Sequence, residues 1–314
     1  MINFRYHVVS LAAVFLALAI GLVVGTAAAN GPIADNLKDQ IGNLTAEKEQ
    51  QRNDLDQARL ELEKNEDFAN ELAPILLSGK LAGKRVLLAK IEGTDKAVDK
   101  VADGVAEMLT ASGAKLTGRV TVRERFTAPG SKDELLDLAE TSAPPSISGA
   151  LPNQGNGVDT SAALLASVLL GKTGAPAVEG ARTVLSAYEE RGFLSLDGDF
   201  GAPAEAVILI TGAAPTGKDA KERGANVLTV ATRFDLAGRL VVGGLSATGL
   251  VQAVRDDASI AKSVSTVDNT VSGQGQIAVV LAVVERIAGK TGHYGIGNKA
   301  TALLPKPASV RDGS

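Results

Sequence analysis

The sequence predicts an α/β protein in which an N-terminal transmembrane helix continues into a long coiled-coil helix, followed by one open, mostly parallel α/β domain. An uncharged apolar run spans residues 8–29, a heptad pattern follows it, and short apolar strands then alternate with helical segments. We therefore expect four segments. They are a cytoplasmic stub and transmembrane signal anchor (1–31), a coiled-coil stalk (32–79), an extracytoplasmic α/β domain (80–290) and a flexible C-terminal tail (291–314).

The apolar run is long enough to cross a membrane as a helix. About 20 apolar residues span the hydrocarbon core, and this run has 22. Arg5 precedes the run and Asp35 is the first charge after it, so the positive-inside rule predicts a cytoplasmic N-terminus. The alternative is a cleaved signal peptide, because Ala27-Ala28-Ala29 resembles a cleavage site, although such apolar regions usually have about 7–15 residues. Both alternatives export the body, and the anchor predicts a single-pass protein of the cell membrane.

The stalk carries a seam of residues at alternating spacings of four and three. The seam positions are Leu37, Ile41, Leu44, Lys48, Gln51, Leu55, Ala58 and Leu62. This pattern is typical of helices that pair, and its polar positions can specify register and oligomeric state. We expect a homodimer, or pairing with a second protein, through the coiled coil; the alternative is a single solvated helix packed on its own domain. Pro74 predicts a kink or a restart of the helix near its end.

The body alternates between strand and helix patterns. Strands are expected at residues 85–90, 116–122, 193–196, 206–211, 227–231, 239–243 and 264–267. Helices are expected at residues 96–111, 131–141, 160–170, 178–191 and 274–288. Strands joined by helices favour right-handed crossovers and a parallel sheet, so we expect one Rossmann-like domain. The run Ala206–Thr211 is the most apolar of the strands and should lie at its centre.

One loop resembles a phosphate-binding motif. Gly212–Asp219 follows an apolar strand and matches the P-loop spacing as far as Lys218. The next residue should be Ser or Thr to ligate Mg²⁺, and the carboxylate of Asp219 would instead repel phosphate. We therefore expect an ordinary strand-to-helix loop. A cleft for an unspecified ligand at the carboxyl ends of the strands, near Gly212, remains a separate hypothesis.

Composition excludes several classes of function. The chain has no cysteine and two histidines, so thiolate metal sites, Fe–S clusters and cysteine nucleophiles are excluded. The chain has no G-x-S-x-G motif, so neither His7 nor His293 can act as the base of a serine hydrolase of that type. His7, His293, Met1 and Met108 also do not occur at the spacing of a copper site. We predict no catalytic, cofactor-binding or metal-ligating residue, and no enzyme. A net charge of −4 and few aromatic residues argue against nucleic acid as a partner.

The opening segment Met1–Gly21 (MINFRYHVVSLAAVFLALAIG) resembles the start of the actinobacterial MctB-like copper transporter family. Three later segments, Ser265–Asn269, Gly292–Gly295 and Leu303–Pro305, agree with this resemblance. It implies a single-pass envelope protein that serves copper transport or copper homeostasis, and copper is implied by this resemblance alone. Some members, known as SteB, look like envelope factors that pair with a membrane partner, SteA. They imply the alternative of a non-enzymatic coiled-coil adaptor in cell-envelope assembly or cell division.

Overall fold

The computed structural model describes residues 4–93, 95–152 and 156–306, with side chains described outside residues 28–34. The chain divides into two compact units, Met1–Asn65 and Glu66–Ser314. The first unit is helical, and the second contains the sheet and the helices that cover it.

A single helix, α1 (Phe4–Leu77), contains both the apolar run and the predicted stalk. Its segment Phe4–Ala27 is long and apolar enough to cross a membrane, and its side chains are exposed. The expected continuation of the apolar helix into the stalk is therefore present.

The expected restart of the helix at Pro74 is wrong, because α1 continues to Leu77 and the Ser78 amide donates to the Pro74 carbonyl at 3.1 Å. Proline removes one helical hydrogen bond. Burial of Ala73 and Leu77 in the core of the second unit compensates for this loss and holds the last turn helical.

The second unit is built on a seven-stranded sheet in the order β3-β2-β1-β4-β5-β6-β7. The strands are β1 (Arg85–Ile91), β2 (Lys115–Val122), β3 (Leu194–Asp197), β4 (Ala206–Thr211), β5 (Arg239–Gly244), β6 (Ser265–Val267) and β7 (His293–Tyr294). All neighbouring pairs are parallel except β2 and β3. The chain extends from β1 outward in one direction through β3 and then returns to place β4 on the other side of β1. The strand order therefore reverses between β1 and β4, and this is the topological switch point.

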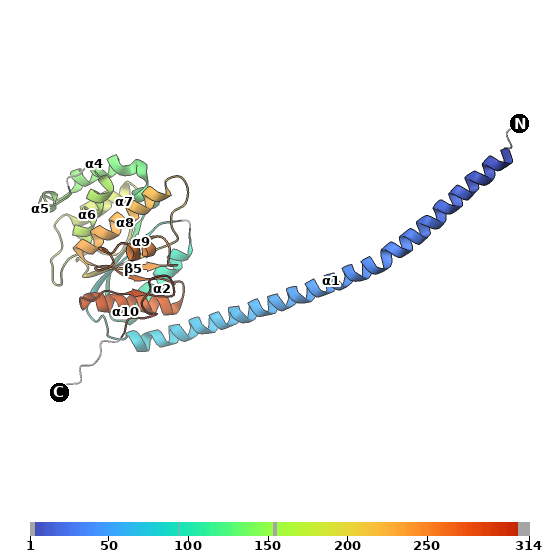
Figure 1. The fold of residues 1–314 in the computed structure, drawn as a ribbon. Coiled ribbons are helices and arrows are strands. Elements are labelled where there is room, and N and C mark those ends of the chain that lie inside the picture. The colour runs from blue at the N-terminus through green and yellow to red at the C-terminus, as the bar shows by residue number, and fades with distance from the viewer. Residues whose placement is uncertain (1–3, 94, 153–155, 307–314) are drawn as a thin grey trace. The chain divides into compact units, whose positions relative to one another are not determined.

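Helices cover both faces of the sheet (Figure 1). The last turns of α1 pack on one face with α2 (Ala97–Ala111) and α10 (Gly273–Ile287). The other face carries α4 (Lys132–Ser142), α6 (Gly157–Leu169), α7 (Ala181–Glu190), α8 (Ala220–Ala237) and α9 (Leu250–Asp256). Three short helices lie in the connections: α3 (Glu124–Thr127), the 3₁₀ turn Pro129–Ser131, and α5 (Pro145–Ser148).

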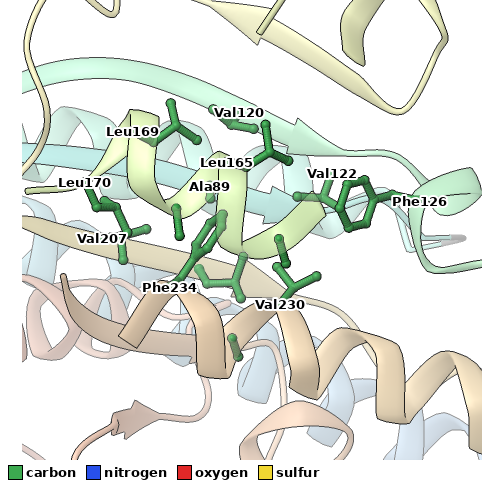
Figure 2. Packing of buried hydrophobic residues seen from close by; sticks show 14 of the residues in the cluster. Ala89, Val120, Val122, Phe126, Leu165, Leu169, Leu170, Val207, Val230 and Phe234 are labelled. Carbon is green, nitrogen blue, oxygen red and sulfur yellow. The ribbon is translucent and has the colours of Figure 1, made fainter. Parts of the chain in front are cut away.

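Strand β4 shows how the sequence specifies this arrangement. All six of its residues are buried, and successive side chains point to opposite faces. Val207 and Leu209 join the cluster beneath α6 and α8, whereas Ile208 and Ile210 join the cluster beneath α2 and α10. Figure 2 shows Val207 on the first of these faces, near Phe234 of α8. An uninterrupted apolar run is what a parallel strand with both faces covered requires.

The expected strand at residues 227–231 is wrong, because these residues lie inside α8. The run VLTVA is apolar and β-branched, which favours a strand locally. The buried positions of α8, however, are Asn226, Val227, Val230, Ala231 and Phe234, and these recur at the spacing of a helix that packs on a sheet.

The C-terminal segment is more ordered than we expected. His293 and Tyr294 form β7 within the tail that the sequence predicts from residue 291, and they extend the sheet beyond β6. The Thr266 amide donates to the Gly292 carbonyl at 3.1 Å, and the Asp268 amide donates to the Tyr294 carbonyl at 3.0 Å.

Candidate functional site

A crevice of about 630 Å³ opens at the carboxyl ends of β1, β4 and β5. The loops that leave β1 and β4 form two of its walls, and the first turns of α8 and α9 form the others. It therefore lies beside the switch point, where the connections leave the sheet in opposite directions and open a gap between their loops. The cleft that the sequence predicts near Gly212 is present, and its volume lies in the range of small-molecule pockets.

The deep part of the crevice is mainly apolar. Ile91, Val227 and Leu250 line it, together with the small residues that follow β4. Thr211, the last residue of β4, also lines the crevice and is only 4% exposed. Its Oγ1 is buried and has no hydrogen-bond partner among the described residues. An unpaired hydroxyl in an apolar site is unfavourable, so a hydrogen-bond partner for this atom would be favourable.

Carboxylates surround the crevice, and most of their negative charges are paired with cationic side chains of the protein. The Glu92 carboxylate accepts a hydrogen bond from the Glu124 amide at 3.0 Å and lies 3.7 Å from the Arg123 guanidinium. Arg223 forms an ion pair with Glu124. These contacts join the ends of β1 and β2 to the first turn of α8.

The two remaining carboxylates also have partners. Asp95 accepts from the Ala97 amide at 3.0 Å, at the start of α2, and Asp256 lies 2.5 Å from the Lys299 ammonium. Hydrogen bonding to Lys299 lowers the pKa of Asp256. Lys221 differs from all of these, because in the described part of the chain its ammonium has no carboxylate within ion-pair distance.

The segment that resembles a P-loop has a different arrangement in the structure. The segment 212–219 connects β4 to α8, and Gly217 has a φ of +95°, which glycine adopts without strain. Lys218 is exposed and does not line the crevice. Asp219 precedes the first turn of α8 and makes no side-chain cap. The Ala220 amide donates to the Gly217 carbonyl at 3.3 Å and the Arg223 amide to the Asp219 carbonyl at 2.9 Å, so among the described residues the amides of Lys221 and Glu222 are left for another acceptor.

A second cluster of polar residues lies at the edge of the sheet formed by β6 and β7. Arg255 and Asp268 form an ion pair with 2.7 Å between Nη1 and Oδ2, and each side chain is only 1% exposed. Arg255 also donates to the Thr266 hydroxyl at 2.8 Å and to the Tyr294 carbonyl at 2.7 Å. Asp268 accepts from the Ile296 amide at 2.8 Å.

This ion pair holds β6 and the segment after β7 together. Gly295 has a φ of +120°, and an added Cβ there would collide with the Asp268 carboxylate. His293 Nδ1 lies 2.9 Å from the Thr266 hydroxyl. Burial, and then the charge of Arg255, lower the pKa of His293. Since its polar groups are paired, we interpret this cluster as a structural clasp. Local sequence patterns do not predict this cluster, and the charged residues of Ser265–Asn269 and of α9 are its only signal in the sequence.

The predicted seam residues all lie on α1 and are exposed. Leu37, Leu44 and Leu62 are 55%, 64% and 65% exposed, and the other five seam positions are exposed as well. Leu60 is 55% exposed too, but it lies off the seam. Pairing of α1 through these residues remains a prediction.

Copper ligands do not gather in the described residues. His7 lies on α1, Met108 on α2 and His293 on β7. No group of three or more His, Cys, Asp or Glu residues in the described ranges is arranged to hold a metal ion.

Comparison with known proteins points to one family. The family model described as "Copper transport outer membrane protein, MctB" matches residues 1–305. The chain is 31% identical over 319 residues to the protein named copper transporter MctB from Mycobacterium tuberculosis (strain ATCC 25618 / H37Rv), covering 96% of this chain and 99% of that protein. The protein of the same name from Mycobacterium leprae (strain TN) is 30% identical over 325 residues, with the same coverage. These names support the copper interpretation and lend no support to the SteB-type alternative.

Proposed function

Because the chain belongs to the MctB family of copper transport proteins, we propose that it serves copper transport or homeostasis at the cell envelope as a single-pass membrane protein. The observation that carries this proposal is the match over residues 1–305, which includes the apolar span of α1 as well as the α/β domain. A match restricted to the domain would have left the anchor without support.

We place the N-terminus in the cytoplasm and the α/β domain outside the membrane. Arg5 lies at the start of this segment, before the uncharged run 8–29, and the next Asp, Glu, Lys or Arg is Asp35. The absence of native cysteine allows a direct test. An Asn3→Cys variant should be protected from a membrane-impermeant maleimide in spheroplasts, whereas a Lys218→Cys variant should be labelled. Labelling of the first variant and protection of the second would reverse the proposed orientation.

We propose that copper is handled by an assembly rather than by one chain. Cu(I) favours thiolate and thioether ligands, and Cu(II) favours imidazole. The described residues offer His7, His293 and Met108 on three different elements. A parallel pair of α1 helices would bring equivalent donors of two copies to the same level, and a partner protein would add donors of its own. The role proposed for the chain involves no enzymatic step.

The seam provides the test of assembly. In full-length protein purified in a mild detergent, we expect a protein mass of at least two chains by light scattering. Leu44→Asp should reduce it to one chain, because a carboxylate cannot be buried in an apolar layer without a partner. Leu60→Asp is the matched control, since it adds the same charge on the same helix away from the seam. A wild-type protein with the mass of one chain would contradict self-association, and capture of a second protein from membranes would then identify the pairing as heteromeric.

The same variants test the function in cells. Deletion of the gene should raise cell-associated copper and copper sensitivity. Expression of the wild type or of Leu60→Asp in the deletion strain should return copper content and copper sensitivity to their original levels, whereas expression of Leu44→Asp should not. Unchanged copper content in the deletion strain would refute the proposed role, whatever the oligomeric state.

A further inference from the structure

We propose that the crevice at the switch point binds a small organic monocarboxylate with an apolar body and a hydroxyl group. This inference is independent of the copper proposal, because it rests on the crevice and on no metal ligand. Three features of the crevice specify the three parts of the ligand: its charge, its body and its hydroxyl.

The pairing of the ionic groups around the crevice indicates the charge of the ligand. Three of the carboxylates around the crevice have cationic partners, and Asp95 is bound at the start of α2. Of the two cationic lining residues, Arg223 is paired with Glu124, whereas Lys221 has no ion-pair partner among the described residues and lies in the first turn of α8. One unpaired ammonium beside uncapped helix amides suits one negative charge.

A carboxylate fits this position better than a phosphate. A phosphate monoester carries close to two negative charges near pH 7, and Asp219 precedes the same helix turn. Glu92, Glu124 and Asp256 add further negative charge around the crevice, although each is paired. A carboxylate halves the repulsion from these groups while keeping the contact with Lys221.

The side chain of Thr211 indicates the hydroxyl group of the ligand. Its Oγ1 is the buried side-chain oxygen in the crevice that lacks a partner. It lies at the end of β4, on the face covered by α8, so it is on the same side of the sheet as Lys221. A valine would fill the same space without an unpaired polar atom, and this makes the hydroxyl hard to explain by packing alone. The apolar side chains of Ile91, Val227 and Leu250 suit the remaining body of the ligand.

Four short, water-soluble probes separate these contributions in calorimetric titrations of the detergent-solubilised full-length chain. 3-Phenyllactate has the carboxylate, the apolar ring and the hydroxyl, and 3-phenylpropionate lacks only the hydroxyl. 3-Phenylpropane-1,2-diol lacks the charge, and 2-phenylethyl phosphate carries a phosphate. We expect 3-phenyllactate to bind most tightly, with the diol and the phosphate at least about tenfold weaker.

Matched variants assign the effect to residues. Lys221→Gln should weaken both carboxylate probes about tenfold, and Lys218→Gln, an exposed lysine of the same loop outside the crevice, should weaken neither. Thr211→Val should weaken 3-phenyllactate about fivefold and leave 3-phenylpropionate unchanged. Absence of 3-phenyllactate binding up to about 10 mM, equal binding of the diol, tighter binding of the phosphate, or affinities unchanged by Lys221→Gln would each overturn the proposal.

Discussion

Replacement of Asp268 by Asn should destabilise the α/β domain more than any other single change of charge in it. Asparagine keeps the shape of the side chain and an oxygen that can accept from the Ile296 amide, now 2.8 Å from the carboxylate. It removes the negative charge that lies 2.7 Å from Nη1 of Arg255. Because Arg255 is 1% exposed, its charge would remain buried without a counter-charge.

Breaking a buried ion pair in this way costs about 3–5 kcal/mol. Two backbone carbonyls, those of Tyr294 and Asn298, still accept from Arg255 at 2.7 and 3.0 Å. We therefore expect the free energy of unfolding to fall by about 3 kcal/mol, the lower end of that range. The free energy of unfolding of a typical domain is about 5–15 kcal/mol. Urea unfolding followed by circular dichroism measures the loss. Hydrogen exchange at the Ile296 amide should accelerate in parallel, because Asp268 is its acceptor.

The control is Asp256→Asn, which removes a carboxylate 2.5 Å from Lys299 at the surface. Both residues of that pair are about half exposed, so water replaces the lost contact and little stability should change. If Asp268→Asn behaved like Asp256→Asn, the buried pair would contribute no stability and the interpretation of the cluster as a clasp would be wrong. The double change Arg255→Met with Asp268→Leu should recover part of the loss, because it leaves no buried charge.

Three further expectations concern stability. Thr211→Val should raise the free energy of unfolding by about 1 kcal/mol, because it removes an unpaired buried hydroxyl; a melting temperature at or below that of the wild type would show that the hydroxyl has a partner. Burial and Arg255 lower the pKa of His293, so the unfolded chain takes up a proton first as the pH falls below about 6.5. Stability is thus fully present above that pH and declines toward the lowered native pKa, and His293→Gln should flatten the decline in melts between about pH 7 and pH 5. Gly157→Ala should destabilise by more than about 1 kcal/mol, because an added Cβ would collide with the Lys132 carbonyl oxygen where α6 crosses α4; unfolding in urea like that of the wild type would contradict this close approach.

Local patterns in the sequence were sufficient to predict most of the elements but not how they meet. The run Ala206–Thr211 predicts a buried strand because six successive apolar or small residues suit a sheet covered on both faces. The strand predicted at residues 227–231 is wrong because a five-residue apolar run fits either a strand or a buried helix. The strand His293–Tyr294 is too short to carry a pattern, and it exists because its backbone pairs with β6.

The crevice depends still more on non-local structure. Lys221 and Thr211 are ten residues apart in the sequence, but Ile91 and Leu250 reach the same place only through the order of the strands. The position of the cleft near Gly212 could be predicted, since switch points lie at strand carboxyl ends. The charge of the crevice could not be predicted, because only the folded structure pairs Glu124 with Arg223 and Asp256 with Lys299.

The two segments Ser265–Asn269 and Gly292–Gly295, which resemble the family in sequence, lie apart from the crevice. Ser265–Asn269 and Gly292–Gly295 meet at the buried ion pair, and neither segment lines the crevice. These two segments therefore help to hold the domain together, whereas the family match over residues 1–305 includes the crevice as well. If copper is handled by an assembly of chains and not by the crevice, copper handling should not require the charge of Lys221. We expect Lys221→Gln to restore the copper content of a deletion strain while losing affinity for 3-phenyllactate. Failure of a folded Lys221→Gln protein to restore copper content would instead tie the crevice to copper handling.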